Sequence, residues 1–322
     1  MPNGLSADQD DMVDADIRRF VDAIGAAYAA HGAPADAGLA ERRLVAERVR
    51  QPWREGGPIM AESVDLDMAG IRLRLHRPTA DKKLPVMLYI HGGGWVLFSI
   101  DTHDRMMREY AARAGIAVIG IDYSRAPESK FPVALEECSA AIDWIAAHAE
   151  ALDLDAGHIL IGGDSAGANL SVATCLLRRQ RGEALPVGMV LNYGAFAPEH
   201  TPSYGRFGDG RYSLDSNEMD SFWADYVDSA DQFGDPLVVP LRANLSGLPP
   251  AFLAVAECDI LADCNSAFAD RLRSADVPVH AVLYRGATHS FLEAVSIAPL
   301  AARAFDEQAA WIRGIIYHDD VV

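Results

Sequence analysis

The chain has 322 residues, of which 50% are hydrophobic and 23% are charged, and its formal net charge is −18. This length exceeds one average domain, but an α/β fold often runs past about 250 residues as a single unit. Because nucleic acids and anionic membranes are bound by concentrated basic surfaces, the acidic balance argues against both as partners. No stretch approaches about 18 uninterrupted apolar residues, so the sequence predicts no membrane span.

Cysteine usage and the first residues bear on the compartment. Four cysteines without a C-x-x-C pair are too few for a disulfide framework, so free thiols are expected at Cys138, Cys175, Cys258 and Cys264. The segment Met1–Asp16 is rich in aspartate and has neither the basic nor the apolar region of a secretion signal. Together these features predict a cytoplasmic protein.

The first fifty residues predict two helices. Apolar residues recur on one helical face from Val13 to Tyr28, and Gly32 with Pro34 ends this run. A second helix is predicted over about Leu39–Val49, ending before Pro52.

A β-hairpin follows. A strand near Ser63–Leu66 leads into a turn at Met68–Gly70, and Ile71–Leu75 then alternates strictly between apolar and polar residues.

From Leu84 onward, apolar strands alternate with helices such as Ala134–His148 and Ala166–Arg181. The predicted strands are Pro85–Ile90, Ile116–Ile121, His158–Ile161, Val187–Leu191, Ala251–Ala256 and Val279–Tyr284. Near-continuous apolar strands separated by helices indicate an α/β protein whose mostly parallel sheet is covered on both faces. With the hairpin, the sheet has about eight strands, and its antiparallel pair comes first.

The segment Pro198–Asp235 breaks this alternation. It is rich in carboxylates and contains seven aromatic residues: Tyr204, Phe207, Tyr212, Phe222, Trp223, Tyr226 and Phe233. It is too long for an ordinary connection, so we interpret it as a functional lid or a solvated insertion.

The sequence Gly163-Asp164-Ser165-Ala166-Gly167 matches G-x-S-x-G, follows an apolar strand and opens a helix. This is the setting of a nucleophile elbow, a sharp turn that exposes a reactive serine. Glycines suit it because a Cβ would clash where the backbones approach. The alternative is a glycine-rich turn in which the serine is incidental.

Three successive glycines, Gly92–Gly94, follow the strand Pro85–Ile90 within His91-Gly92-Gly93-Gly94-Trp95. A phosphate-binding loop is one interpretation, but the chain has no G-x-G-x-x-G and no G-K-[ST]. The other is an oxyanion hole, in which backbone N–H groups meet the charge that develops on a carbonyl oxygen. The two motifs together favour the oxyanion hole.

A serine hydroxyl needs a base to activate it and an acid to orient that base. In the fold that carries a nucleophile elbow, these residues follow one another in the chain order serine, acid, histidine. Four histidines follow Ser165: His200, His280, His289 and His318. His200 lies in the proposed lid, His280 lies inside a strand, and His318 lies in the final helix or tail. His289 comes just after the last predicted strand, which makes it the preferred base.

The acid is expected after the strand Ala251–Ala256, where Glu257, Asp259 and Asp263 are the candidates. Glu257 is placed at the end of the strand, and Asp263 is placed near the start of the next helix, where a capping role is the simpler explanation. Asp259 lies in the loop between them and is therefore preferred.

These residues resemble the hormone-sensitive-lipase-like (type IV bacterial) esterases of the α/β-hydrolase superfamily. The resemblance covers roughly Leu84 to the C-terminus, with family-like helices before it. Four blocks carry it: the H-G-G-G-W of His91–Trp95, the G-D-S-A-G of Gly163–Gly167, the D-Y and A-P-E…F-P of Asp122–Pro132, and the acid block Asp259–Asp263. The chain departs from the family pattern at Ser124-Arg125, Ile260, Cys264 and Ser290.

The resemblance implies an α/β-hydrolase fold with a mainly helical cap from about residues 1–50 and 198–235, and a catalytic core of about 51–197 and 236–322. It also implies catalytic Ser165, Asp259 and His289, an oxyanion hole from Gly93, Gly94 and Ala166, and a structural His91 that supports the glycine loop. Most cap aromatics are then expected to pack the cap onto the core rather than to touch substrate.

The expected activity is serine carboxylesterase action on a small-molecule ester, with short acyl groups as the family expectation. The same triad also cleaves amides, so an amidase or deacylase stays open. A non-catalytic receptor is the alternative from another class, although such receptors often lose the serine or histidine. No H-E-x-x-H or Cys/His cluster suggests a metal, and no cofactor is expected. The sequence does not decide the oligomeric state, and a homodimer is one state that it allows.

Overall fold

The computed structural model describes residues 12–32, 37–80 and 83–317. Within them, one eight-stranded sheet has the order β1-β2-β4-β3-β5-β6-β7-β8. The strands are β1 (Glu62–Met68), β2 (Ile71–Arg77), β3 (Leu84–Ile90), β4 (Ala117–Ile121), β5 (Leu154–Asp164), β6 (Met189–Asn192), β7 (Ala251–Cys258) and β8 (Val279–Thr288). β2 pairs antiparallel with β1 and β4, and all other pairs are parallel. The predicted α/β class and the initial hairpin are confirmed.

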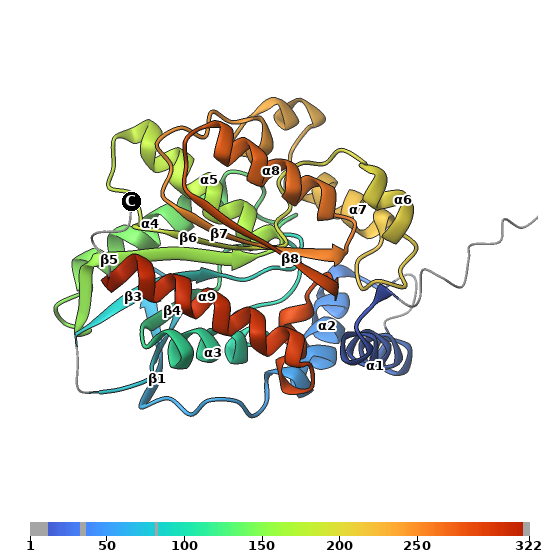
Figure 1. Cartoon of the computed structure of the whole chain (residues 1–322), viewed down its shortest axis with the longest axis horizontal. Coiled ribbons are helices and arrows are strands. Elements are labelled where there is room, and N and C mark those ends of the chain that lie inside the picture. Colours follow the sequence, from blue (N-terminus) through green and yellow to red (C-terminus); the bar gives the residue numbers. More distant parts are fainter. Residues whose placement is uncertain (1–11, 33–36, 81–82, 318–322) are drawn as a thin grey trace, which may run out of the picture.

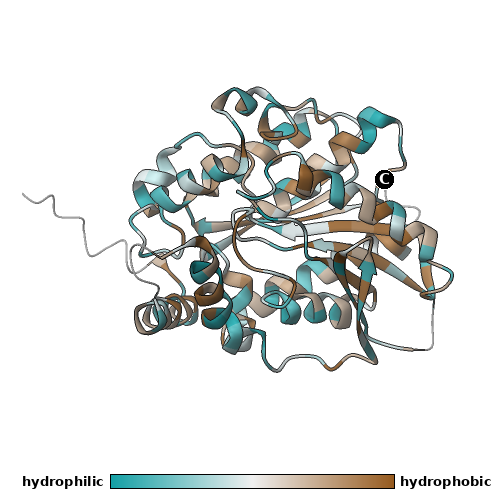
Figure 2. Ribbon diagram, turned by 180° about the vertical axis from the view of Figure 1, so that it is seen from behind, coloured by the Kyte–Doolittle hydropathy of each residue, from teal (hydrophilic) through white to brown (hydrophobic). Residues whose placement is uncertain are grey.

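Helices cover both faces of this sheet (Figure 1). α4 (Val133–His148), α5 (Ala166–Arg181) and α8 (Ala262–Ser274) lie on one face, and α3 (Asp104–Ala114) and α9 (Pro299–Tyr317) lie on the other. The central strands β3 and β4 are buried at every position, and Figure 2 shows the hydrophobic colour concentrated along the sheet and on the helix faces that meet it. This double burial explains why these strands are apolar throughout instead of alternating.

The second N-terminal helix is longer than the sequence predicts. α2 (Leu39–Arg54) continues through Pro52, whereas we expected it to end before this residue. A proline removes one main-chain hydrogen bond and crowds the preceding turn. Because Pro52 lies in the last turn of the helix, the disruption falls on its end and the helix tolerates it.

Four helices gather near the carboxyl ends of the parallel strands (Figure 1): α1 (Ala15–His31), α2, α6 (Pro202–Phe207) and α7 (Ser216–Tyr226). Of the seven aromatic residues between 198 and 235, five are buried, namely Tyr204, Phe207, Tyr212, Trp223 and Tyr226. Tyr226 stacks on Trp95 with ring centroids 4.2 Å apart. Most of these rings therefore pack the segment onto the core, as predicted, while Phe222 stays half-buried.

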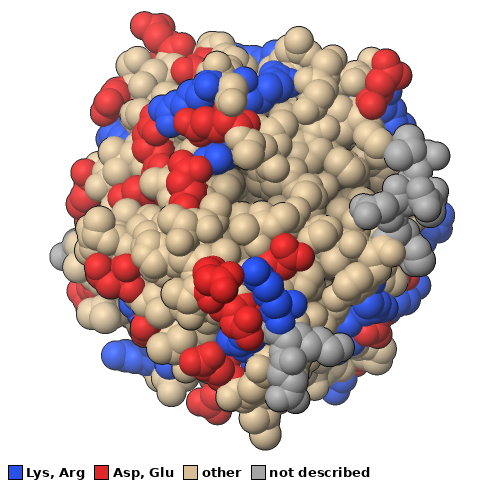
Figure 3. Space-filling view, turned by 90° about the vertical axis from the view of Figure 1, so that its left-hand side faces the viewer, with Lys and Arg blue, Asp and Glu red and all other residues tan. Residues whose placement is uncertain are grey.

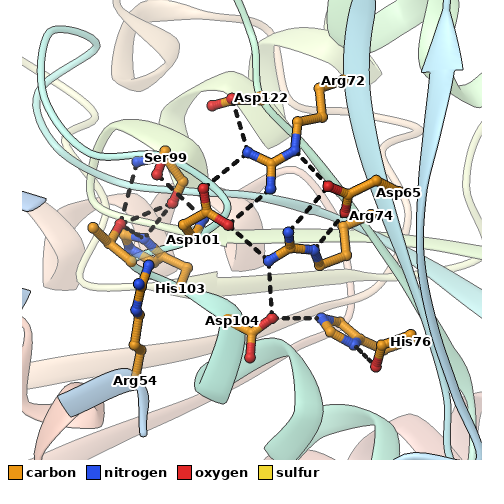
Figure 4. Close-up of polar contacts among 12 residues, drawn as sticks. Arg54, Asp65, Arg72, Arg74, His76, Ser99, Asp101, His103, Asp104 and Asp122 are labelled. Carbon is orange, nitrogen blue, oxygen red and sulfur yellow. Dashed lines mark hydrogen bonds and ion pairs between the residues drawn. The ribbon is translucent and has the colours of Figure 1, made fainter. Parts of the chain in front are cut away.

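A network of charged side chains fastens the hairpin to the loop before α3 (Figure 4). Arg72 donates to both carboxylate oxygens of Asp101 at 2.8 Å and to Asp65 at 2.8 Å. Arg74 contacts Asp65, Asp101 and Asp104 at 2.6 to 3.1 Å. Single exposed ion pairs stabilise a protein little, but shared bidentate contacts hold a definite geometry. The network thus fixes the loop that carries His103, which reaches the site described below.

The end of the molecule opposite α1, α2, α6 and α7 carries acidic and basic side chains side by side (Figure 3). On that face neither sign of charge forms one continuous field. Among the described helices, none is both long enough and apolar enough to cross a bilayer.

The turn from β5 into α5 generates a stability prediction. A Cβ on Gly167 would lie well inside the contact distance of the backbone carbonyl oxygen of Ile90, and this backbone atom cannot move aside easily. Gly167→Ala should therefore lower the free energy of unfolding by about 3 kcal/mol, measured by urea denaturation.

The matched control is Gly314→Ala in α9, where a Cβ would meet nothing within 4 Å. This change should leave stability unchanged or raise it by up to about 1 kcal/mol, because alanine is the better helix former. If both variants had the same free energy of unfolding, the close approach at Gly167 would not contribute to stability.

Candidate active site

Ser165 lies at a strained turn between β5 and α5. Its φ of 53° and ψ of −117° are rare for a residue with a side chain, and its backbone N–H donates to the carbonyl of Asn192 at 2.9 Å. The turn is tight because Gly163 and Gly167 both approach the carbonyl oxygen of Ile90 more closely than a Cβ would allow. The G-x-S-x-G segment therefore forms the predicted elbow, with the serine at its apex.

The structure brings together the three residues that the sequence selected. Nε2 of His289 lies 3.0 Å from Oγ of Ser165, and Nδ1 of His289 lies 2.8 Å from Oδ2 of Asp259. The other carboxylate oxygen of Asp259 accepts a hydrogen bond from the backbone N–H of Leu261 at 3.0 Å. These contacts form a Ser–His–Asp chain in which the carboxylate is held by its own loop.

Burial and the neighbouring carboxylate act in opposite directions on the base. Burial by itself lowers the pKa of His289, because it disfavours the charged ring. The Asp259 carboxylate raises it through its charge and its hydrogen bond, and the net result is a pKa above the ordinary histidine value. The imidazolium is thus stabilised where a proton from Ser165 would arrive.

The glycine loop after β3 has the backbone that only glycine adopts easily. Gly93 and Gly94 have φ values of 108° and 59°, and the N–H groups of Val96 and Leu97 close a turn on the carbonyl of Gly93 at 3.0 and 2.8 Å. A Cβ on Gly94 would overlap the ring of Phe222 from α7. The glycine loop and α7 are therefore in direct contact.

A buried carboxylate joins this loop to the elbow. Oδ1 of Asp164 accepts hydrogen bonds from the hydroxyl of Tyr89 at 2.7 Å and from the N–H of Gly92 at 3.1 Å. Its Oδ2 lies 3.3 Å from Nε2 of His103. Burial raises the pKa of Asp164, but the charge and hydrogen bond of His103 and the hydrogen bond of Tyr89 together lower it below the ordinary value. Asp164 is therefore charged, and it holds the two loops in register.

His91 has the structural role that the resemblance implied. Its ring stacks on Tyr123 with centroids 4.3 Å apart, and its Nδ1 lies 2.7 Å from the carbonyl of Gly92. Burial lowers the pKa of His91 to about 3, so the ring is neutral. It supports the glycine loop from within the core and does not face the cavity as a base.

The histidines and carboxylates that the sequence did not favour as base or acid have other contacts. His200 is exposed and contacts Asp220 at 2.8 Å, His280 is exposed on β8, and His318 lies outside the described residues. Glu257 accepts the N–H of Gly286 at 2.8 Å, and Asp263 accepts the N–H of Ser203 at 2.9 Å. Both carboxylates therefore fix loops and do not orient His289.

Three departures from the family pattern now have a structural description. Ser290 has a φ of 61°, in the left-handed region that favours the usual glycine, so a serine here carries some backbone strain. Cys264 is buried and Ile260 is buried beside the acid loop, and neither displaces the Asp259 carboxylate from His289.

A cavity of about 210 Å³ opens above Ser165 and His289. Its wall comes from the glycine loop, α1, α2 and the segment from 210 to 222, and includes Tyr28, Arg50, Glu218 and Phe222. A second cavity of about 580 Å³ adjoins it and shares Tyr28, Leu97, Glu218 and Phe222. Among the described residues, no three His, Cys, Asp or Glu side chains are placed to hold a metal ion.

Sequence reasoning missed the polar residues of this wall. Arg50 and Glu218 lie on α2 and α7, far apart in the chain, and neither belongs to a motif. Asp164 was visible inside G-D-S-A-G, but its partners Tyr89 and His103 gave no signal. Arg50 and Glu218 come together only because α2 and α7 both border the cavity above Ser165.

Comparisons with known proteins agree with this geometry. A family model described as alpha/beta hydrolase fold matches residues 87–293. The carboxylic ester hydrolase LipN of Mycobacterium tuberculosis is 36% identical over 271 residues, covering 80% of this chain and 72% of that protein. The acetyl esterase of Salmonella schwarzengrund is 30% identical over 284 residues, covering 86% of this chain and 87% of its own length.

Solved structures are similar over nearly the whole chain. An alpha/beta hydrolase enzyme from the metagenome of Lake Arreo, Spain, superimposes with a TM-score of 0.88 at 33% identity, covering 95% of this chain and 99% of that one. An esterase from Pyrobaculum calidifontis has a TM-score of 0.87 at 31% identity and covers the same shares. The chain therefore belongs to the hormone-sensitive-lipase-like carboxylesterase family of the α/β-hydrolase superfamily.

Proposed function

We propose that this protein is a serine carboxylesterase that hydrolyses short-acyl esters through an acyl-enzyme at Ser165. The observation that carries the proposal is the contact chain from Ser165 Oγ to His289 Nε2 at 3.0 Å and from His289 Nδ1 to Asp259 at 2.8 Å, at the floor of a cavity. Family membership supports the reaction class.

In the proposed first step, His289 takes the proton of Ser165 as the hydroxyl oxygen attacks the ester carbonyl. Asp259 keeps the ring in the orientation that presents Nε2 to the serine, and its charge stabilises the imidazolium. The imidazolium then gives its proton to the leaving alcohol, and the acyl group stays on Ser165. Water repeats the sequence with His289 as its base and releases the acid.

We assign the oxyanion hole to the backbone N–H groups of Gly93, Gly94 and Ala166. The left-handed backbone at Gly93 and Gly94 and the start of α5 at Ala166 support this assignment. Preorganised donors contribute most where charge develops in a site shielded from water. Asp164 supports them indirectly, because it holds Gly92 beside the elbow.

The preference for short acyl groups rests on the size of the cavity. Its volume of about 210 Å³ lies below the range of about 300–1,000 Å³ typical of sites for drug-sized ligands. The half-buried ring of Phe222 stands in the wall shared with the larger adjoining cavity. A long chain would have to displace this ring.

We also propose that residues of about 1–50 and 198–235 act together as the cap over this site, with residues 1–11 and 33–36 outside the described part. A cytoplasmic location and a homodimer stay predictions from the sequence. The four cysteines, all free and buried, are in keeping with a reducing compartment.

Replacing the nucleophile is the direct test. Ser165→Ala should lower kcat for p-nitrophenyl acetate by about 10⁵- to 10⁶-fold, because alanine has no hydroxyl to attack the ester. A phosphonate ester should add covalently to Ser165 of the natural protein, seen by mass spectrometry, and not to the variant. Ser274→Ala, at the exposed end of α8, is the control and should keep full activity. Wild-type turnover by Ser165→Ala would refute the assignment.

The pH profile tests the base. Below its pKa, His289 is protonated and cannot accept a proton, so kcat/KM should rise with pH through an inflection above the ordinary value of about 6.5. In Asp259→Asn the carboxylate that raises the pKa is gone, so the inflection should shift to lower pH and activity should fall by about 10⁴-fold.

A second group in the cavity must be separated from His289 in this measurement. Burial and the Asp215 carboxylate raise the pKa of Glu218 to about 7. Glu218→Gln should therefore retain an inflection from His289, moved to lower pH because the Glu218 carboxylate contributes to the raised pKa of His289. If the inflection vanished in Glu218→Gln, or stayed in place in Asp259→Asn, the profile would not report the proposed base.

A chain-length panel tests the acyl preference. With p-nitrophenyl esters, kcat/KM should be highest for acetate to butyrate and should fall steeply by octanoate. Phe222→Ala should extend activity to octanoate, because removing the ring from the shared wall joins the two cavities. Phe233→Ala, an aromatic of the same segment outside both cavities, should leave the profile unchanged. Equal turnover of acetate and palmitate by the natural protein would contradict the short-acyl proposal.

A further inference from the structure

The active-site cavity contains a guanidinium that the proposed reaction does not use. Arg50, near the end of α2, is only 5% exposed and lines the same cavity as Ser165. Its Nε lies 2.7 Å from a carboxylate oxygen of Glu293, and its guanidinium carbon lies 4.9 Å from the centroid of the Phe98 ring. Its Nη1 has no hydrogen-bond partner among the described residues. Buried donors in native proteins are normally paired, so this group has unused hydrogen-bonding capacity.

A second polar group without a partner lies in the same wall. Glu218, in the first turn of α7, borders both the active-site cavity and the adjoining one. Glu218 is exposed, and its carboxylate makes no hydrogen bond or ion pair with another residue in the described part of the chain, although the charges of Arg50 and His289 act on it. Near pH 7 it can serve as an acceptor, or as a donor when protonated.

The balance of charge restricts what these groups can bind. The charge of Arg50 is already offset by Glu293, so the unpaired Glu218 leaves the wall with no excess of positive charge. A substrate carboxylate would be repelled by Glu218, and an ammonium group has no acceptor to offer the N–H groups of Arg50. A hydroxyl group is neutral, accepts from a guanidinium and donates to a carboxylate, so it satisfies both.

We propose that Arg50 and Glu218 form a recognition pair for hydroxyl groups of the substrate. The preferred substrates are then neutral short-acyl esters that carry hydroxyl groups, either as esters of polyols or as esters of hydroxy acids, rather than alkyl esters of equal length. This inference deepens the proposed function and rests on it. A mere structural tie between α2 and the His289 loop would account for the Arg50–Glu293 pair, but not for the buried Nη1 of Arg50 that has no partner at the wall of the active-site cavity.

Matched substrates separate hydroxyl recognition from size. On the alcohol side, kcat/KM for glycerol monoacetate is compared with that for propyl acetate. On the acyl side, p-nitrophenyl 3-hydroxybutyrate is compared with p-nitrophenyl butyrate, and a p-nitrophenyl hemisuccinate supplies the carboxylate. The natural protein should prefer the hydroxylated member by about tenfold or more on one side, in line with hydrogen bonds to charged groups. It should use the hemisuccinate less well than the butyrate.

Variants of Glu218 then test the assignment. Glu218→Leu should reduce the hydroxyl preference by about tenfold, measured as the ratio of kcat/KM for the hydroxylated ester to kcat/KM for the alkyl ester. Glu218→Gln keeps an acceptor and should retain most of the preference. Asp220→Leu is the matched control, because Asp220 lies on the same helix but borders neither of these cavities. It should leave the preference unchanged.

Arg50 is tested with its partner, since Arg50→Met alone would leave the buried carboxylate of Glu293 unpaired. The double variant R50M/E293M should lose the preference to the same extent as Glu218→Leu. If the double variant does not fold, the two Glu218 variants still decide.

Equal use of hydroxylated and alkyl esters on both sides, or a preference that survives Glu218→Leu, would overturn the inference and leave the esterase proposal standing. A preference for the hemisuccinate would overturn it as well and make Arg50 an anion site. Failure to hydrolyse p-nitrophenyl acetate would instead contradict the proposed function itself.

Discussion

The position of the reacting groups depends on one buried carboxylate that takes no part in the proposed chemistry. Asp164 receives the N–H of Gly92 on the loop after β3, while its own backbone belongs to the elbow after β5. An isolated buried charge would be costly, but Tyr89 and His103 satisfy it from two further elements. Loss of this carboxylate would therefore free the glycine loop from the elbow, although the residues of the glycine loop and Ser165 itself would be unchanged.

A second buried ion pair relates the cap to the base. Arg50 comes from α2, and Glu293 lies in the short 3₁₀-helix η4 (Phe291–Ser296) that follows His289 in the chain. The ring of Phe222 from α7 lies against Gly94 on the other side of the cavity. α2 thus contacts the segment that follows the base, and α7 contacts the loop assigned to the oxyanion hole.

The sequence was informative where function is encoded locally or by fold topology. Ser165 lies in a turn whose glycines are needed at fixed spacing, and Asp259 and His289 follow strands whose carboxyl ends meet at one edge of the sheet. Chain order and strand position were enough to select them. The course of α2 through Pro52 was predicted wrongly, because tertiary packing at the end of a helix outweighs the local preference.

The cavity residues that the sequence did not reveal lie on helices and not at the ends of strands. Arg50, Glu218 and Phe222 lie on helices with no fixed relation to the strand ends, so their meeting over Ser165 depends on how the cap docks. Nothing in their spacing carries that information. The side chains of Glu218 and Phe222 make no hydrogen bond to Ser165, His289 or Asp259, so they can change while these three keep their hydrogen bonds, whereas Arg50 can change only together with its partner Glu293. A fold of this kind can therefore alter which ester it accepts through cap helices while the hydrolytic machinery on the sheet stays fixed.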